Sequence, residues 1–157
     1  MSEYSTKLDQ NDQLSRSQAH PRVLLTTKPL CPLQAEALVL NDQCGAVTIF
    51  CGRVRDHNEG QGVLSITYEA YEAMAYKVMA DIVAEAHLKF TPISALAHHR
   101  LGKLEVGDAA VVVAVASAHR KITFEACSWI IEQLKARTPI FKHEHRKDGV
   151  VWVGMGP

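Results

Sequence analysis

The sequence Ala109-Ala-Val-Val-Val-Ala-Val-Ala116 contains no polar residue, and it runs directly into Ser117-Ala-His-Arg-Lys121. A strand without a polar face is typical of the centre of a sheet that is covered on both sides. We therefore expect residues 109–116 to form a central strand with other elements packed against both faces. The remaining elements have to be arranged around this strand.

The residues after this strand predict a helix over 121–137. Four apolar side chains recur at helical spacing and form one stripe: Phe124, Cys127, Ile131 and Leu134. Such a stripe is the pattern of a helix that packs one face against a core. The helix is therefore expected to cover one face of the central strand.

Basic side chains surround this predicted helix. His119 and Arg120 precede it, Lys135 lies in its last turn, and a Thr-Pro turn could bring Lys142 back beside Lys135. Because unpaired N–H groups at a helix start bind anions readily, the pattern favours chemistry on an anionic substrate. The alternative is structural, with solvated turn residues, a lysine stabilised by the helix dipole and a solubilising lysine on a strand.

A second basic pair, Arg53 and Arg55, ends a predicted strand over residues 45–54. Side chains two residues apart on a strand point to the same face, so the two guanidinium groups could clamp a phosphate between them. A solvated hairpin tip explains the same residues equally well.

The rest of the chain predicts an α+β domain. Further strands are expected at 22–26, 64–70, 95–101, 140–146 and 150–153, and further helices at 32–40 and 73–90. We expect 45–54 and 64–70 to pair as a long hairpin and 102–108 to be a turn-rich connection. Hairpins mixed with helices indicate a mainly antiparallel sheet with two to three packed helices. Polar residues 1–20 predict a disordered leader, and 21–157 a single domain.

Composition excludes several classes of function. The 17 basic and 17 acidic side chains of the 157 residues balance, which argues against nucleic-acid or membrane-surface binding. No apolar run approaches the roughly 20 residues of a membrane span. The four cysteines and the histidine pairs lack metal-ligand spacing, so we expect no metal and no cofactor. Structural thiols in a reducing cytoplasm are the preferred interpretation of the cysteines.

Taken in order, the motifs resemble the large, catalytic subunit of molybdopterin synthase, the MoaE family. The resemblance covers residues 22–152 and is carried by Gly52-Arg-Val-Arg55 with Asn58, Tyr68-Glu69, His99-Arg-Leu-Gly102, Gly107-Asp108, Ser117-Ala-His-Arg120, Phe124-Glu-Ala126, Leu134-Lys135 and Pro139-Ile-Phe-Lys142. Each motif is short, but the ordered set is specific. The resemblance implies the α/β hammerhead fold of that family.

The resemblance also implies an activity, a sulfurtransferase step in molybdenum cofactor biosynthesis. The implied substrate is cyclic pyranopterin monophosphate, which is converted to molybdopterin. The implied sulfur donor is a small ubiquitin-like subunit, MoaD-like, with a thiocarboxylated C-terminal glycine. The family forms a homodimer within a heterotetramer, in which one small subunit docks at each end.

The resemblance assigns roles to residues that match its motifs. Lys135 and Lys142 correspond to the catalytic lysines. The substrate-binding positions correspond to Arg53, Val54, Arg55, His119, Arg120, Lys142, His143 and Glu144. Relatives often continue with a polar, basic tail, so we expect any contribution of such a tail to a neighbouring pocket to be missing or different after Gly154.

Two other functions remain open at this point. The first is a non-catalytic scaffold that binds the tail of a ubiquitin-like protein, although such a scaffold has no need of both lysines. The second is a regulatory domain that binds a phosphate ester through Arg53, Arg55, His119 and Arg120 alone.

Overall fold

The computed structural model describes residues 22–155, without the side chain of Met155, so the expected leader over 1–20 lies outside the described residues. The first of its sheets has the strand order β1-β6-β8-β2. These strands are β1 (Val23–Thr26), β6 (Ser94–Arg100), β8 (Ala109–Ser117) and β2 (Ala46–Arg53). β1 and β6 are parallel, and the other neighbours are antiparallel. The apolar strand β8 is central, as predicted.

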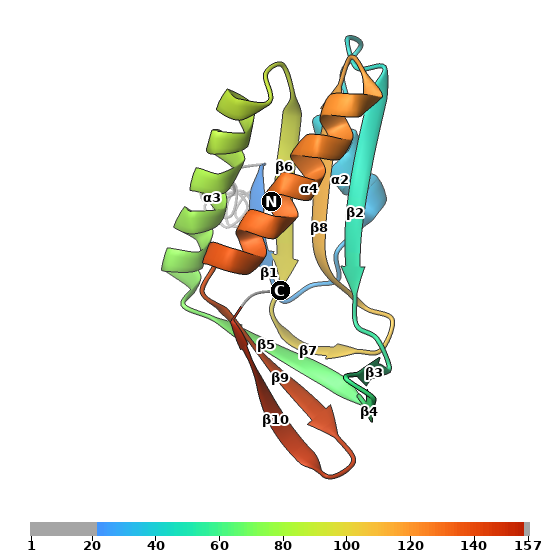
Figure 1. Cartoon of the computed structure of the whole chain (residues 1–157), viewed down its shortest axis with the longest axis vertical. Coiled ribbons are helices and arrows are strands. Elements are labelled where there is room, and N and C mark those ends of the chain that lie inside the picture. Colours follow the sequence, from blue (N-terminus) through green and yellow to red (C-terminus); the bar gives the residue numbers. More distant parts are fainter. Residues whose placement is uncertain (1–21, 156–157) are drawn as a thin grey trace, which may run out of the picture.

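Helices cover both faces of this sheet. Helix α2 (Pro32–Val39) lies on one face, and α3 (Glu72–Lys89) and α4 (Arg120–Arg137) lie side by side on the other (Figure 1). Alternate residues of β8 enter the two cores: Val112, Ala114 and Ala116 pack with α2, whereas Val111, Val113 and Val115 belong to the larger core with α3 and α4. No helix in the described range is long and apolar enough to cross a membrane.

A second sheet lies beyond one end of the first (Figure 1). Its order is β10-β9-β5-β7, all antiparallel, from β10 (Gly149–Met155), β9 (Ile140–Arg146), β5 (Ser65–Ala70) and β7 (Gly102–Glu105). A two-stranded ribbon of β3 (His57–Asn58) and β4 (Gln61–Gly62) completes the fold. The predicted α+β class, with mainly antiparallel strands and two to three helices, is confirmed.

The predicted hairpin of residues 45–54 and 64–70 is wrong. β2 pairs with β8 in the first sheet, and β5 lies between β7 and β9 in the second. The intervening segment folds into the β3–β4 ribbon and carries the chain from one sheet to the other. The predicted connection over 102–108 also differs, because residues 102–105 form β7 as the edge partner of β5.

A buried histidine packs at the junction of the two sheets. The ring of His99, on β6, meets the ring of Tyr68, on β5, edge to face at 5.1 Å. His99 is 1% exposed, its Nδ1 is 2.8 Å from the carbonyl oxygen of Arg100, and its Nε2 has no hydrogen-bond partner within residues 22–155. Burial lowers the pKa of His99 to about 4 because the imidazolium would lose its hydration. His99 is therefore neutral at physiological pH.

This pKa predicts how stability changes with pH. Folded His99 binds a proton near pH 4 and an unfolded histidine near 6.5, so the unfolded state holds more protons between these values. The stability that comes from keeping His99 neutral is fully present above pH 6.5. We expect the free energy of unfolding to fall by about 1.4 kcal/mol per pH unit as the pH drops from 6.5 towards 4. Urea unfolding of wild type and His99→Phe, from pH 7 to 4, measures it. A wild-type slope equal to that of the variant contradicts the prediction.

Candidate functional site

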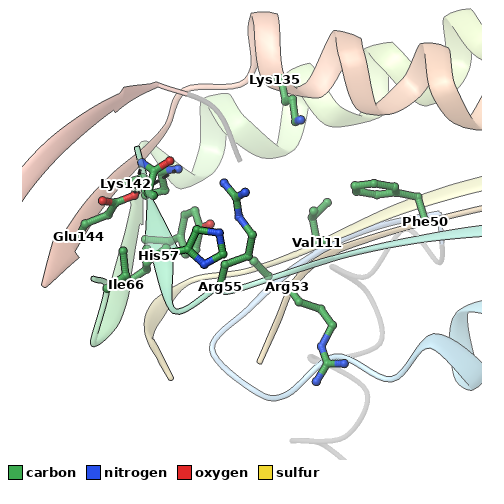
Figure 2. Close-up of a pocket in the computed structure, with 14 residues that line it drawn as sticks. Phe50, Arg53, Arg55, His57, Ile66, Val111, Lys135, Lys142 and Glu144 are labelled. Carbon is green, nitrogen blue, oxygen red and sulfur yellow. Dashed lines mark hydrogen bonds and ion pairs between the residues drawn. The ribbon is translucent and has the colours of Figure 1, made fainter. Parts of the chain in front are cut away.

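A cavity of about 320 Å³ lies where the two sheets and the end of α4 meet (Figure 2). Its polar wall comes from residues of both sheets, the ribbon and α4: Arg53, Arg55, His57, Asn58, Tyr68, Lys135, Lys142 and Glu144. Its apolar wall includes Phe50, Val63, Ile66, Ala110 and Val111. The cavity therefore combines charged groups with an apolar floor, as ligand sites commonly do.

Three of the cations that line this cavity come from distant parts of the chain and are directed into it. Lys135 comes from the last turn of α4, Lys142 from β9, and Arg55 from the segment after β2. Figure 2 shows the guanidinium of Arg55 rising between the two lysine side chains. Neither Arg55 nor Lys135 has a hydrogen-bond or ion-pair partner among the described residues. These two cations are free to bind an anionic ligand.

A buried carboxylate organises the side of the cavity near Lys142. Glu144 is 1% exposed, and its Oε1 accepts a hydrogen bond from Asn58 Nδ2 at 2.8 Å and lies 3.9 Å from Lys142 Nζ. Its Oε2 accepts a hydrogen bond from Arg146 at 2.7 Å. Lys142 and Glu144 are two residues apart on β9, so both face the cavity. Glu144 thus binds protein groups that in turn shape the site, and Lys142 is the cation with a partner.

The phenol of Tyr68 adds a neutral group to the wall. Burial raises the pKa of Tyr68 to about 12, and the nearby carboxylate of Glu144 adds to the rise. The phenol therefore stays protonated at neutral pH and can donate a hydrogen bond. Together with the three cations, it gives the cavity a lining that favours negative charge.

Arg53, Val54 and His143 do not point their side chains into the cavity. Arg53 contributes to the wall, but its Nε donates to the carbonyl of Gly107 at 2.8 Å and its guanidinium turns away from Arg55 (Figure 2). The expectation that Arg53 and Arg55 share a face is wrong, because the β2–β8 register shifts between Gly52 and Arg53 and regular alternation ends there. Val54 is buried in the core.

His143 lies on the opposite face of β9 from Lys142 and Glu144. Its ring packs edge to face on Trp152 at 4.5 Å, and its Nε2 is 3.4 Å from Glu69 Oε2 without forming an aligned hydrogen bond. Strand alternation explains this placement, since the residue between two cavity-facing residues points the other way.

His119 and Arg120 lie at the opposite end of α4 from Lys135. Both are exposed at the start of the helix, and neither lines the cavity of the same protomer. An 18-residue helix is about 27 Å long, so no side-chain rotation can bring the two ends together. The first turn of α4 contains no acidic residue, and His119 makes no capping hydrogen bond through its side chain. The helix start is thus open to an anion from outside the protomer.

Several wall residues had no predicted role in the site. Phe50, near the end of β2, and Val111, near the start of β8, lie on neighbouring strands, where Val111 pairs with Gly52. Tyr68 and Asn58 were matched only as parts of motifs. The sequence did not predict that β2 pairs with β8, and so it could not place Phe50 and Val111 in one wall. Within the described range, no group of three or more His, Cys, Asp or Glu side chains could hold a metal ion.

The contacts of Glu144 predict a large effect on stability. Glu144→Gln removes the carboxylate that pairs with Arg146 in the described part of the chain and leaves that cation, which is 14% exposed, partly buried. We expect the free energy of unfolding to fall by about 3 kcal/mol, measured by urea denaturation at pH 7. The matched control is Glu105→Gln, whose ion pair with Lys103 is well exposed and whose loss should cost less than about 1 kcal/mol. Equal losses in the two variants would contradict this role of Glu144.

Comparison with known proteins places the chain in a family. The family model described as "MoaE protein" matches residues 25–137. A molybdopterin synthase catalytic subunit of Pyrococcus abyssi is 43% identical over 120 residues, which cover 76% of this chain and 81% of the relative. One of Bacillus subtilis is 45% identical over 112 residues, covering 71% of each.

A solved structure gives the same result. The crystal structure of molybdopterin synthase from Staphylococcus aureus superposes with a TM-score of 0.80 at 36% identity, covering 83% of this chain and 96% of that one. The family model spans most of the chain, and the relatives match over most of their length. The chain belongs to the MoaE family.

Proposed function

We propose that this chain is the catalytic subunit of a molybdopterin synthase. It converts cyclic pyranopterin monophosphate to molybdopterin by sulfur transfer in molybdenum cofactor biosynthesis. The sulfur comes from the thiocarboxylated C-terminal glycine of a small ubiquitin-like subunit, whose tail enters the cavity. Relatives named as catalytic subunits of this enzyme, at 38–45% identity, support the proposal.

The observation that carries the proposal is the convergence of Arg55, Lys135 and Lys142 on one cavity. Both reactants are anions, one a phosphate ester and the other a thiocarboxylate. Of these three cations only Lys142 has a carboxylate close by within residues 22–155, so the lining keeps an excess of positive charge for ligands. Cations fixed in place before the reaction stabilise negative charge without reorganising during it.

The cations take different parts in the proposed reaction. Lys135 acts at the reacting sulfur, as an acid–base group or by stabilising the charge that builds as sulfur attacks. Arg55 binds the anionic end of the donor tail or the substrate, and Lys142 closes the cavity beside Glu144. No cysteine of the chain is needed, because the sulfur arrives on the partner.

His119 and Arg120 enter the proposal through a second copy of the chain. They cannot reach the cavity of their own protomer, yet they form an exposed basic pair at an open helix start. In a homodimer each protomer supplies this pair to the cavity of the other, where it binds the phosphate of the substrate. In this proposal Arg53 and His143 do not touch the substrate, because their side chains contact other protein groups.

The cytoplasm is the proposed compartment. All four cysteines are free thiols in the structure, and three of them are at least partly accessible. Free thiols persist in reducing compartments, where disulfides are rare.

Lys135→Ala tests the assignment of the catalytic lysine. With a thiocarboxylated small subunit and cyclic pyranopterin monophosphate, wild type should form molybdopterin, and the variant should lose about 10²–10³-fold in rate. Binding of the small subunit, measured by calorimetry, should remain. Lys77→Ala, an exposed lysine of α3 paired with Asp81, is the control and should keep wild-type activity.

The outcomes separate the competing functions. Full activity of Lys135→Ala contradicts the catalytic assignment. A wild-type protein that binds the small subunit but forms no product is the scaffold. A protein that binds the phosphate ester without binding the small subunit is the regulatory domain.

Mixing two inactive variants tests the shared site. Lys135→Ala and Arg120→Ala should each be weakly active alone. If α4 of one protomer serves the cavity of the other, a re-equilibrated equal mixture should recover about a quarter of wild-type activity, since half of the dimers are mixed and one of their two sites is intact. No recovery, with mixed dimers shown by native mass spectrometry, contradicts the arrangement.

A further inference from the structure

The turn between β7 and β8 contacts the segment that carries Arg55. Gly107 N–H donates to the carbonyl of Val54 at 2.8 Å, and Val54 N–H donates to the carbonyl of Asp108 at 3.0 Å. The Nε of Arg53 donates to the carbonyl of Gly107 at 2.8 Å. Three hydrogen bonds thus join residues 53–54 to residues 107–108.

These hydrogen bonds lie where the regular pairing of β2 with β8 ends. β2 ends at Arg53, and its register with β8 shifts between Gly52 and Arg53. Beyond that point, both hydrogen-bonding groups of the Val54 backbone are used on the turn. Arg55 has no hydrogen-bond or ion-pair partner of its own among the described residues, so the backbone is what fixes the point from which its side chain starts and the direction of its Cα–Cβ bond.

An ion pair between Arg100 and Asp108 stabilises this turn. Asp108 Oδ2 accepts hydrogen bonds from Glu105 N–H at 2.9 Å and from Arg100 at 3.2 Å. Arg100 is only 16% exposed, and its Nε donates to the carbonyl of Thr27 at 3.3 Å. Gly107 adopts a φ of +92°, which glycine reaches without strain. Arg100 therefore ties the turn to β6 and to the chain after β1.

We propose that Arg100 and Asp108 are positioning residues for Arg55: their ion pair fixes the turn at 106–108, the turn clamps Val54, and the clamped backbone aims Arg55 into the cavity. The ion pair does not line the cavity, so its effect on substrate passes through Arg55. This inference rests on the proposed function for its kinetic consequence, whereas the clamp itself can be measured without substrate.

The size of the effect follows from the role of Arg55. A cation that binds a ligand anion has to be in place before the ligand arrives, and a misplacement of about 1 Å can cost as much as 10²-fold. Loosening the clamp leaves the charge of Arg55 intact, but it lets the guanidinium occupy a wider range of positions. Weaker substrate binding is therefore expected, with little change in the chemical step at Lys135.

Asp108→Asn is the test. Asparagine keeps an oxygen for Glu105 N–H but loses the charge that Arg100 binds. We expect amide exchange at Val54 and Gly107, followed by NMR, to quicken about tenfold. The KM for the anion that Arg55 binds, whether cyclic pyranopterin monophosphate or the thiocarboxylated small subunit, should rise about tenfold while kcat stays within about twofold. Glu85→Gln is the matched control, because it breaks another arginine ion pair, with Arg137 between α3 and α4, and should change neither quantity.

A double variant separates positioning from general loss of structure. If Asp108 acts through Arg55, then Asp108→Asn should add nothing to the KM of Arg55→Ala. A further rise of the same size in that background overturns the proposal, as does quickened exchange with an unchanged KM. If wild type forms no molybdopterin, the proposed function fails, and unchanged exchange in Asp108→Asn is then the result that overturns the clamp.

Discussion

Burial of β8 on both faces is the constraint from which the position of the site follows. A strand without a polar side needs a layer on each side, and α2 and α4 supply these layers. Because α4 begins directly after β8 and packs back along it, α4 must end near the start of the strand (Figure 1). The last turn of α4, with Lys135, therefore lies at the same end of the first sheet as the start of β8, and Lys135, Ala110 and Val111 line one cavity. The cavity forms at this end because β2 also ends there.

The charged groups at this end of the fold differ in whether protein partners neutralise them. Glu144 is buried with hydrogen bonds to Asn58 and Arg146, and it lies near Lys142. A carboxylate taken out of water needs such partners, since desolvation is costly when a charge is unpaired. Arg55 and Lys135 receive no comparable partner from the part of the chain that the structure describes. Their charge is more readily tolerated because both can reach solvent through the open cavity, and an arriving anion can pair with them.

The sequence predicted those elements whose pattern allows a single interpretation. An apolar run of eight residues identified β8, and a helical stripe identified α4 to within one residue at its start. Strand alternation holds along β2, where Val47, Ile49 and Cys51 pack with the α2 core. Alternation contains no information about the partner of a strand, and so β2 was paired with β5 instead of β8. The strand β7 was missed because it is short and half polar.

Site residues were predictable as motifs but not as a constellation. Arg53 and Arg55 were expected to act together, but alternation holds only in a regular ladder, and the register shift separates them. For His119 and Arg120 the limit was already present in the sequence, because a predicted helix of this length cannot bring its first turn to its last.

Helix α4 acts as a spacer in the proposed dimer. Thr123, Ala126, Ile130 and Leu134 are buried along its length, so packing fixes the helix and hence the separation of its two basic ends. In a two-fold dimer, a contact made by one protomer to the other is made in return. If the helix start of one copy enters the cavity of its partner, both cavities gain His119 and Arg120 together. Each single chain then has Arg55, Lys135 and Lys142 directed into a cavity and the basic pair His119 and Arg120 that serves only a second copy, which makes the dimer the smallest complete unit for binding two anionic reactants.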